Sequence, residues 1–198
     1  EGQAVYKRAE AVMALATEHG FPFWLAEATI FVGWVQAEQG QGSEGIAQIQ
    51  HGLATRQAIG LELSQPAYLT MLAEAYENVG QPAEGLAMLA DALTRVNTTG
   101  ERWWEAELHR LRGELLLALS AENHREAETC FQQALALARH QQAKSLELRA
   151  AMSLSRLWQR QGKRAEARQL LTDIYSWFTE GFDTADLQEV KALLEELA

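Results

Sequence analysis

One pattern recurs along this chain about every forty residues. Small residues mark it at successive steps of 40, 40 and 42 residues, at Gly33, Ala73, Gly113 and Ser155. A helix-ending glycine or serine follows seven residues after each, at Gly40, Gly80, Ser120 and Gly162. Such a period is typical of a stacked solenoid, in which no unit buries its apolar face alone. The repeat therefore constrains the architecture strongly and the identity of a partner weakly.

A second set of positions follows in register on the next helix of each unit. It comprises Gly45, Gly85, Ala127 and Ala167, and then Ile49, Leu89, Phe131 and Leu171. Apolar residues recur at helical spacing nearly from end to end, and only three prolines occur in 198 residues. These features predict an all-α fold without strands.

We predict an opening helix, four helix pairs and a closing helix. The expected ranges are 3–18, 23–39, 43–59, 65–79, 82–97, 101–119, 123–141, 144–161, 163–179 and 184–197. Because the connections between them are short, neighbouring helices must run antiparallel.

Three of the units carry residues at the places of the tetratricopeptide (TPR) signature. The matches are Ala73, Tyr76, Gly80, Gly85, Leu89 and Ala92, then Gly113, Leu116, Ser120, Ala127, Phe131 and Ala134, then Ser155, Trp158, Gly162, Ala167, Leu171 and Ile174. The chain thus resembles the TPR family, which implies a right-handed superhelix of antiparallel helix pairs, here of about nine helices. The forty-residue step is longer than the usual 34 of that family, so longer or differently stacked helices are expected.

The resemblance also suggests how the chain is divided. We expect a single repeat domain over 1–198, opening with the last helix of a truncated preceding repeat at 1–20. The repeats and the capping helix then cover 21–60, 61–100, 101–143, 144–182 and 183–198.

Three segments carry a more specific likeness, at 100–108, 143–151 and 177–187. They resemble the C-terminal TPR regions of large predicted bacterial ATPases, often fused behind adenylate or guanylate cyclase domains. This resemblance implies a cytoplasmic, non-catalytic interaction or scaffold module that serves a signalling protein as its regulatory or sensor arm. Its partner would be a protein or peptide segment, or an adjacent domain of the parent protein. The single Cys130 is consistent with a reducing compartment.

Charge and hydropathy exclude some classes of partner. The net charge is −10, and only residues 144–168 form a basic segment. An acidic chain binds nucleic acid poorly, because phosphate neutralisation supplies most of the non-specific affinity. No run of eighteen apolar residues is present, so no membrane span is expected.

No residues assemble into a predicted catalytic, cofactor or metal site. Residues 40–45 match G-x-G-x-x-G, but a dinucleotide site needs a preceding strand and the segment before Gly40 is predicted helical. The five histidines lack the spacing of zinc ligands, and Cys130 lies on a core-facing stretch, where a buried inert thiol is expected.

By the TPR resemblance, the first helix of each pair lines a concave groove. The candidate groove residues are Glu27, Trp34, Glu38, Glu74, Glu77, Asn78, Glu107, Arg110, Glu114, Arg149, Arg156 and Arg160. This face is acidic in three units and basic in the fourth, which would orient a segment that carries both charge signs. A solvated helix face explains the same pattern, and charge runs usually mark solvent.

The aromatic residues leave further alternatives open. Trp24, Trp104 and Trp158 recur in register, which predicts packing, and Trp177 is expected to seal the last pair. Trp34 and Trp103 stand beside core places, so one could form the wall of a small-molecule receptor. A structural oligomerisation spacer is a third hypothesis, and apolar residues of the first helix could support a homodimer through an exposed end.

Overall fold

The computed structural model describes residues 2–198, so Glu1 of the predicted domain lies outside it. Ten α-helices and one 3₁₀ turn follow in order: α1 (Gly2–His19), α2 (Pro22–Glu38), α3 (Gly42–Ala58), α4 (Gln65–Asn78), α5 (Pro82–Thr99), α6 (Glu105–Leu119), η1 (Ala121–Asn123), α7 (His124–His140), α8 (Lys144–Arg160), α9 (Arg164–Tyr175) and α10 (Ala185–Glu196). No strand occurs in this range, which confirms the all-α prediction. Each of the ten predicted ranges corresponds to one of these α-helices, so only the round number of about nine helices differs from the ten found over the same residues.

Two predicted boundaries were wrong by several residues. The helix expected from 101 begins at Glu105, because Gly100 ends α5 in the left-handed conformation, with φ of 75°, and the chain then turns through Arg102–Trp104. The helix expected to reach 179 ends at Tyr175. Left-handed φ values rarely fit any residue but glycine, so Gly100 is an effective helix stop.

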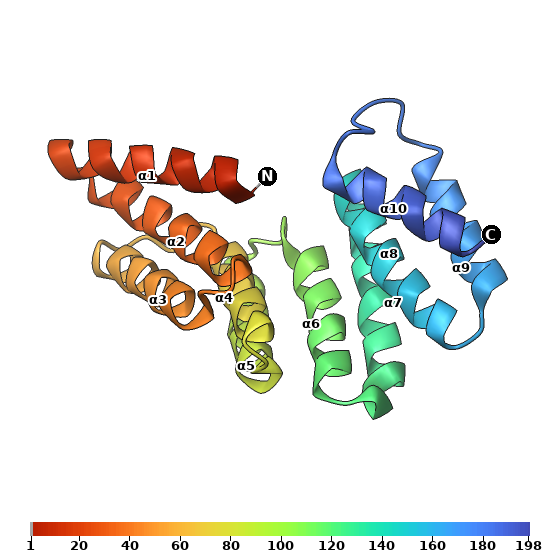
Figure 1. The fold of residues 1–198 in the computed structure, drawn as a ribbon. Helices are drawn as coiled ribbons and strands as arrows, with labels where there is room; N and C mark the ends of the chain where they lie inside the picture. Colours follow the sequence, from red (N-terminus) through yellow and green to blue (C-terminus); the bar gives the residue numbers. More distant parts are fainter. Residues whose placement is uncertain (1) are drawn as a thin grey trace. The chain divides into compact units, whose positions relative to one another are not determined.

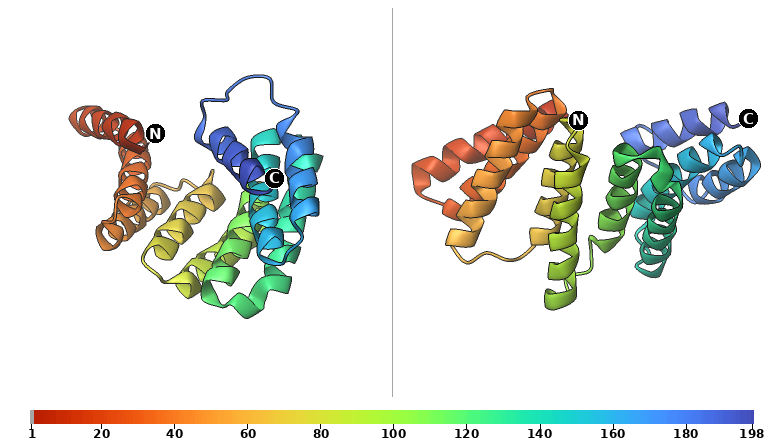
Figure 2. Two further views of the ribbon diagram at one scale, coloured as in Figure 1. Left: turned by 45° about the vertical axis from the view of Figure 1, so that its right-hand side comes forward. Right: turned by 90° about the horizontal axis from the view of Figure 1, so that it is seen from below.

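The chain divides into two compact units, of which unit 1 ends at Glu101 and unit 2 spans Arg102–Ala198. In unit 1, α2 packs on α3 and α4 on α5, while α1 covers α2 (Figures 1 and 2). In unit 2, α6 packs on α7 and α8 on α9, and α10 lies against both α8 and α9. Each unit is thus a short stack of antiparallel helix pairs.

The closest helix contact in unit 1 depends on small residues at the repeat positions. A Cβ atom on Gly45 would lie 2.5 Å from the carbonyl oxygen of Gly33, and one on Gly33 would lie 2.6 Å from the carbonyl oxygen of Gly45. Real Cβ atoms essentially never approach backbone so closely. The recurring small residues therefore let α2 and α3 touch along their backbones.

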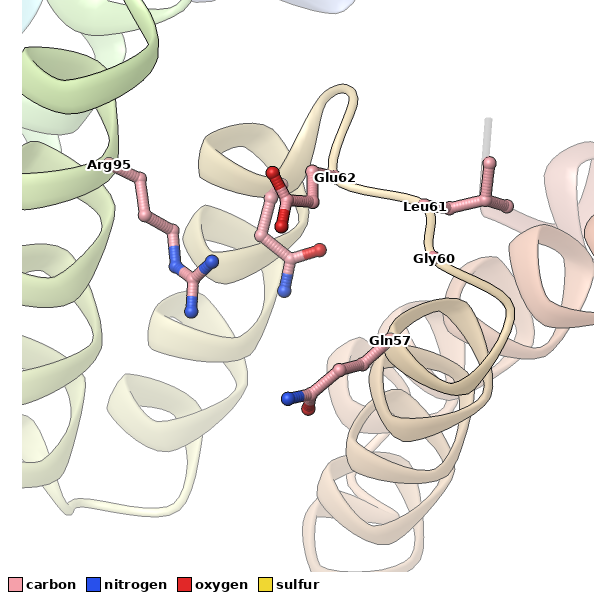
Figure 3. A pocket seen from close by; sticks show the side chains of 6 residues that line it. Gln57, Gly60, Leu61, Glu62 and Arg95 are labelled. Carbon is pink, nitrogen blue, oxygen red and sulfur yellow. The ribbon is translucent and has the colours of Figure 1, made fainter.

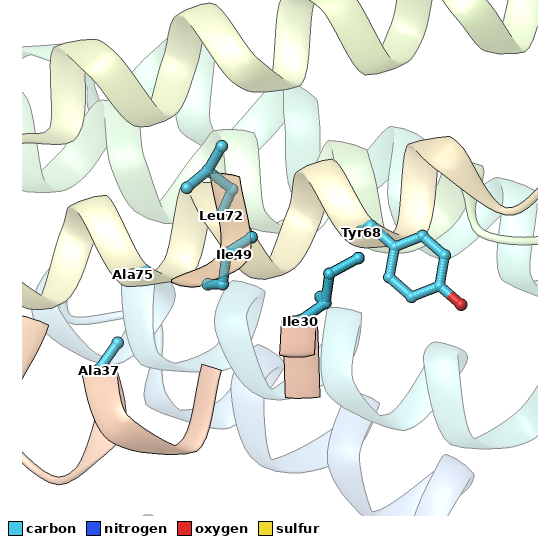
Figure 4. Packing of buried hydrophobic residues seen from close by; sticks show 6 residues of the cluster. All are labelled: Ile30, Ala37, Ile49, Tyr68, Leu72 and Ala75. Atoms are coloured by element: carbon cyan, nitrogen blue, oxygen red, sulfur yellow. The ribbon is translucent and has the colours of Figure 1, made fainter. Parts of the chain in front are cut away.

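The core of unit 1 joins three helices. Ile30 and Ala37 of α2, Ile49 of α3, and Tyr68, Leu72 and Ala75 of α4 form one buried cluster (Figure 4). Ile30 and Ile49 have no exposed surface. Stacking of α4 on the first pair therefore buries the apolar face that this pair could not cover itself.

In unit 2 an aromatic ring fills the corresponding space. Phe131 of α7 is fully buried and packs where a Cβ on Gly113 of α6 would stand, 2.4 Å from a ring carbon. At the C-terminal end, α10 buries Leu187, Val190 and Leu193. None of the helices within residues 2–198 is both long and apolar enough to span a membrane.

Candidate partner-binding surface

The first helices of the pairs, α2, α4, α6 and α8, carry the candidate groove residues. In unit 1, the indole Nε1 of Trp34 on α2 donates a 2.8 Å hydrogen bond to Oε2 of Glu74 on α4. These two residues are one repeat step apart, and Trp34 also packs against the core cluster. Trp34 therefore links consecutive repeats, and its N–H is engaged within the chain.

Glu27 belongs to a cluster that sequence reasoning did not find. It pairs with Arg56 of α3, which is 1% exposed, and accepts a hydrogen bond from the Tyr68 hydroxyl of α4. The Arg56 guanidinium also lies 4.4 Å from the Tyr68 ring centroid and donates to the Leu63 carbonyl. Burial raises the pKa of Tyr68, an effect that the charge of Arg56 opposes, so the phenol stays protonated at neutral pH.

A signal for Arg56 was present in the sequence. It continues the buried stripe of α3 after Ile49 and Gly52, so its position is a core position. Val96 stands one repeat step later and is fully buried. An arginine at a register where the next repeat has valine predicts a buried charge with a specific partner.

In unit 2 the candidates form a charged network across three helices. Glu107 of α6 is 2% exposed, and its Oε1 accepts a 2.7 Å hydrogen bond from Arg110 on the same helix. Arg149 of α8 lies 3.8 Å from Glu107 and donates from Nε to Asp186 of α10 at 2.7 Å. Burial acts to lower the pKa of Arg149, but Asp186 and Glu107 outweigh it and raise that pKa.

The basic segment 144–168 thus faces acidic side chains of the last helix, α10. Arg156 of α8 donates to Glu189 of α10, as Arg149 does to Asp186. Arg110 also lies 3.7 Å from Glu114, which completes the acidic side of the network on α6. Two of the three candidate arginines on α8 therefore hold α10 in place, whereas Arg160 at the end of α8 is exposed.

The remaining candidates lie near the C-terminal ends of their helices. Glu38 and Asn78 are the last residues of α2 and α4 and are exposed, and Glu77 is half-buried. Together with Arg160, they are the candidates most accessible to another molecule.

The tryptophans divide differently from the prediction. Trp158 is half-buried and donates to Glu128 at 2.7 Å, and Trp104 is half-buried against Trp103. Trp24 and Trp177 were expected to pack, but they are 56% and 58% exposed. Trp24 sits beside Val12, Leu15 and Phe21, where α1 meets the start of α2, around an apolar depression of about 300 Å³. The repeat register of Trp24 did not predict its burial correctly, because no described helix covers its side chain.

A polar pocket of about 90 Å³ opens where α3 passes into α4 (Figure 3). Gln57 of α3 and Arg95 of α5 extend into it, with Glu62 on the connecting segment between them (Figure 3). Its remaining lining residues are Gly60, Leu61 and Gln65. None of these residues was predicted as a site.

The other sequence predictions concern the nucleotide-binding motif, the single cysteine and metal ligands. The segment before Gly40 is α2, and Gly42 opens α3, so the G-x-G-x-x-G residues cover a helix–helix turn and the first turn of α3, where Gly45 packs against Gly33. Cys130 is buried, and burial raises the pKa of its thiol. Within residues 2–198 no group of three or more His, Cys, Asp or Glu side chains is placed to hold a metal ion.

Comparison with known proteins supports the fold class. No protein-family model matches the chain. The uncharacterized protein R02095 of Rhizobium meliloti (strain 1021) is 29% identical over 142 residues, which are 72% of this chain and 14% of that protein. The chain therefore spans about one seventh of the length of this relative.

Two solved structures have a similar fold. BtubC (BKLC) from P. vanneervenii superposes with a TM-score of 0.73 and 15% identity, over 100% of this chain and 81% of that one. The TPR-like repeats of a kinesin light chain from Podosopora anserina give a TM-score of 0.65 and 19% identity, over 89% and 86%. The predicted all-α, TPR-like solenoid is confirmed by these similarities.

Proposed function

We propose that the chain is a non-catalytic protein–protein interaction module that binds a peptide segment or an adjacent domain through its first helices. The observation that carries this proposal is the row of charged side chains on those helices, in a fold shared with TPR-like proteins. Within each unit, stacked helix pairs present such charges at a regular spacing, which suits recognition of an extended segment. The capping of Arg149 and Arg156 by α10 limits which of these residues a partner can reach.

The test follows from that limitation. The chain is used to capture partners from its native host, and affinity for each captured protein is then measured with purified variants. Arg160→Glu and Glu38→Arg change exposed candidates without breaking an ion pair of α10, and each is expected to weaken binding about tenfold or more. Arg168→Glu on α9 and Glu84→Arg on α5 are charge-matched controls on the second helices. Equal losses in the controls would contradict the proposal.

We further propose that the module is the cytoplasmic regulatory arm of a bacterial signalling ATPase or cyclase. The likeness of segments 100–108, 143–151 and 177–187 supports this, as does the much greater length of the Rhizobium meliloti relative. ATP hydrolysis and cyclic-nucleotide formation by that relative are the measurements that test it. If the relative has neither activity, this context is wrong, while the interaction module itself remains testable as above.

The domain division is part of the same proposal. It assigns repeats to 21–60, 61–100, 101–143 and 144–182 and a cap to 183–198, and it is supported by the helix pair that falls within each of the four repeat ranges. The alternative function, a small-molecule receptor, would use Trp34 or Trp103 as an aromatic wall. The indole N–H of Trp34 donates to Glu74 within the chain, and this contact does not favour a small-molecule site.

A further inference from the structure

The segments that join consecutive helix pairs carry a pocket at the same register in both units. The junction pocket of unit 1 is the one lined by Gln57, Gly60, Glu62 and Arg95 (Figure 3). The junction pocket of unit 2 is lined by Arg139, Gln142, Lys144 and Trp177, and each of these follows its counterpart in unit 1 by 82 residues. That offset is the distance from Ala73 to Ser155, which is two repeat steps. The repeat itself therefore builds the pocket.

The backbone supports this equivalence. Gly60 has φ of 74° and Gln142 has φ of 55°, so the chain leaves α3 and α7 in the same way, through one left-handed residue. Glycine adopts this conformation freely, whereas another L-residue pays about 1 kcal/mol for it. Unit 2 thus keeps the turn and accepts some strain to place a polar side chain at the pocket.

The chemistry of the two pockets differs. Where unit 1 has Gln57 and Glu62, unit 2 has Arg139 and Lys144, and Trp177 takes the register of Arg95. The junction pocket of unit 2 is therefore cationic and aromatic, in a chain whose net charge is −10. Local charge opposite to that of the whole chain points to an anionic ligand.

A buried carboxylate holds the two cations in position. Glu147 has a side chain only 5% exposed, and it accepts hydrogen bonds from Arg139 Nε at 2.8 Å and Lys144 Nζ at 2.7 Å. One nitrogen of the guanidinium and one hydrogen of the ammonium are used in this way, and each cation has further donors. Because Arg139 is 52% and Lys144 32% exposed, those donors can reach a ligand. Glu147 reduces the net charge but fixes the donors, which lowers the entropy cost of binding.

Trp177 supplies a flat apolar wall beside these donors. Trp177 is 58% exposed, and its ring lies 5.5 Å from Lys144 Nζ and is supported edge-on by Phe178 at a centroid distance of 5.2 Å. The pocket encloses about 350 Å³, at the small end of ligand-binding cavities. It has room for a few side chains and not for a large cofactor.

We propose that the junction pocket of unit 2 binds an acidic peptide segment. A carboxylate of the segment accepts hydrogen bonds from Arg139 and Lys144, and a neighbouring apolar side chain lies on Trp177. Nucleic acid fits less well, because two cations on an acidic chain neutralise too few phosphates. None of the candidate groove residues lines this pocket, so the site stands or falls independently of the proposed function.

The test uses the whole 198-residue chain labelled with ¹⁵N. The indole N–H resonance of Trp177 is assigned by its loss in Trp177→Phe and then followed during titration with a capped peptide of alternating glutamate and leucine. The matched peptide of glutamine and leucine, and inorganic phosphate, are titrated in parallel. The glutamate peptide is expected to shift the resonance at concentrations where the other two do not.

Variants locate the donors. Lys144→Gln and Arg139→Gln are each expected to lower the affinity for the glutamate peptide about tenfold, because each removes one charge-assisted hydrogen bond. Lys191→Gln, which makes the same change of net charge at an exposed position on α10, and Arg95→Gln in unit 1 should change the affinity less than about twofold. Trp177→Ala leaves the Glu147 contacts intact, so a loss of affinity there does not depend on how the Lys144 variant folds. Because this variant lacks the indole reporter, its affinity and that of the unchanged chain are compared by isothermal titration calorimetry with the glutamate peptide.

Several results would overturn the proposal. They are an unmoved Trp177 resonance, an equal shift with the glutamine peptide, and an equal loss with Lys191→Gln. A stronger response to phosphate than to the glutamate peptide would replace the acidic peptide by a phosphate ligand.

Discussion

Arg56 shows how a single charged residue can organise a helix pair from inside. Its side chain is almost completely buried, yet it has a carboxylate, an aromatic face and a carbonyl oxygen around it, from Glu27, Tyr68 and Leu63. A buried charge is costly unless such partners are present. The three partners come from α2, from α4 and from the segment before α4, so one side chain connects both pairs of unit 1.

Removal of Arg56 alone should therefore be more harmful than removal of the ion pair. We expect Arg56→Met to lower the free energy of unfolding by about 3 kcal/mol, because Glu27 loses its cation. The double variant Arg56→Met with Glu27→Gln should recover most of that loss. Urea denaturation followed by circular dichroism measures both.

Arg95→Met is the control, since Arg95 and its partner Asp91 are 40% and 46% exposed. Exposed pairs contribute little, so its effect should stay within about 0.5 kcal/mol. Arg56→Met no worse than Arg95→Met would show that the buried cluster does not stabilise unit 1.

The pairing of charged residues also explains what the sequence could and could not predict. Periodicity predicted the faces of the helices and nearly all their boundaries, because helical spacing depends on local sequence alone. It did not predict that Trp34 would donate to Glu74, or Arg149 to Asp186, since those contacts depend on how consecutive helices stack. Exposure of Trp24 was missed for a related reason: register gives a position in the repeat, and burial depends on which neighbour covers it.

Among the elements, α7 and α8 are joined at their connection by Glu147. Two cations flank this carboxylate, Arg139 on α7 and Lys144 on α8. Burial acts to raise the pKa of Glu147, but the hydrogen bonds and charges of Lys144 and Arg139 outweigh it, and the pKa falls below its ordinary value of 4.5. The folded state therefore favours the ionised form more than the unfolded state does.

The sign of the pH dependence follows. A carboxylate with a lowered native pKa contributes stability above its unfolded pKa, and that contribution is lost as the pH falls through the native value. We expect Glu147→Gln to cost about 2 kcal/mol at neutral pH and progressively less as the pH drops below 4.5. Urea unfolding of both proteins across this range measures the difference.

Glu126→Gln is the matched control, because Glu126 and its ion-pair partner Arg112 have side chains that are 53% and 39% exposed. It should cost little at any pH. A penalty for Glu147→Gln that stays constant from neutral to acidic pH would mean that the carboxylate charge does not join α7 to α8.

For the whole molecule, charge and apolar surface act in opposite directions on self-association. The net charge of −10 repels a second copy. Leu15, Phe21 and Trp24 are each more than half exposed around one apolar depression of unit 1, which favours contact with another apolar surface. Which effect prevails depends on ionic strength, since salt screens the charge and leaves the apolar term in place.

We therefore expect the chain to self-associate more strongly as salt is raised. Sedimentation velocity at about 0.01 M and about 1 M salt, where the Debye length falls from about 30 Å to about 3 Å, should show larger species at the higher concentration. Trp24→Ser combined with Leu15→Lys should abolish the increase, because the two changes remove most of the exposed apolar surface there. Leu63→Ser is the control, as Leu63 is 72% exposed elsewhere in unit 1. Association that weakens with salt would identify ion pairs as its source, and an unchanged response in the double variant would place the contact on another surface.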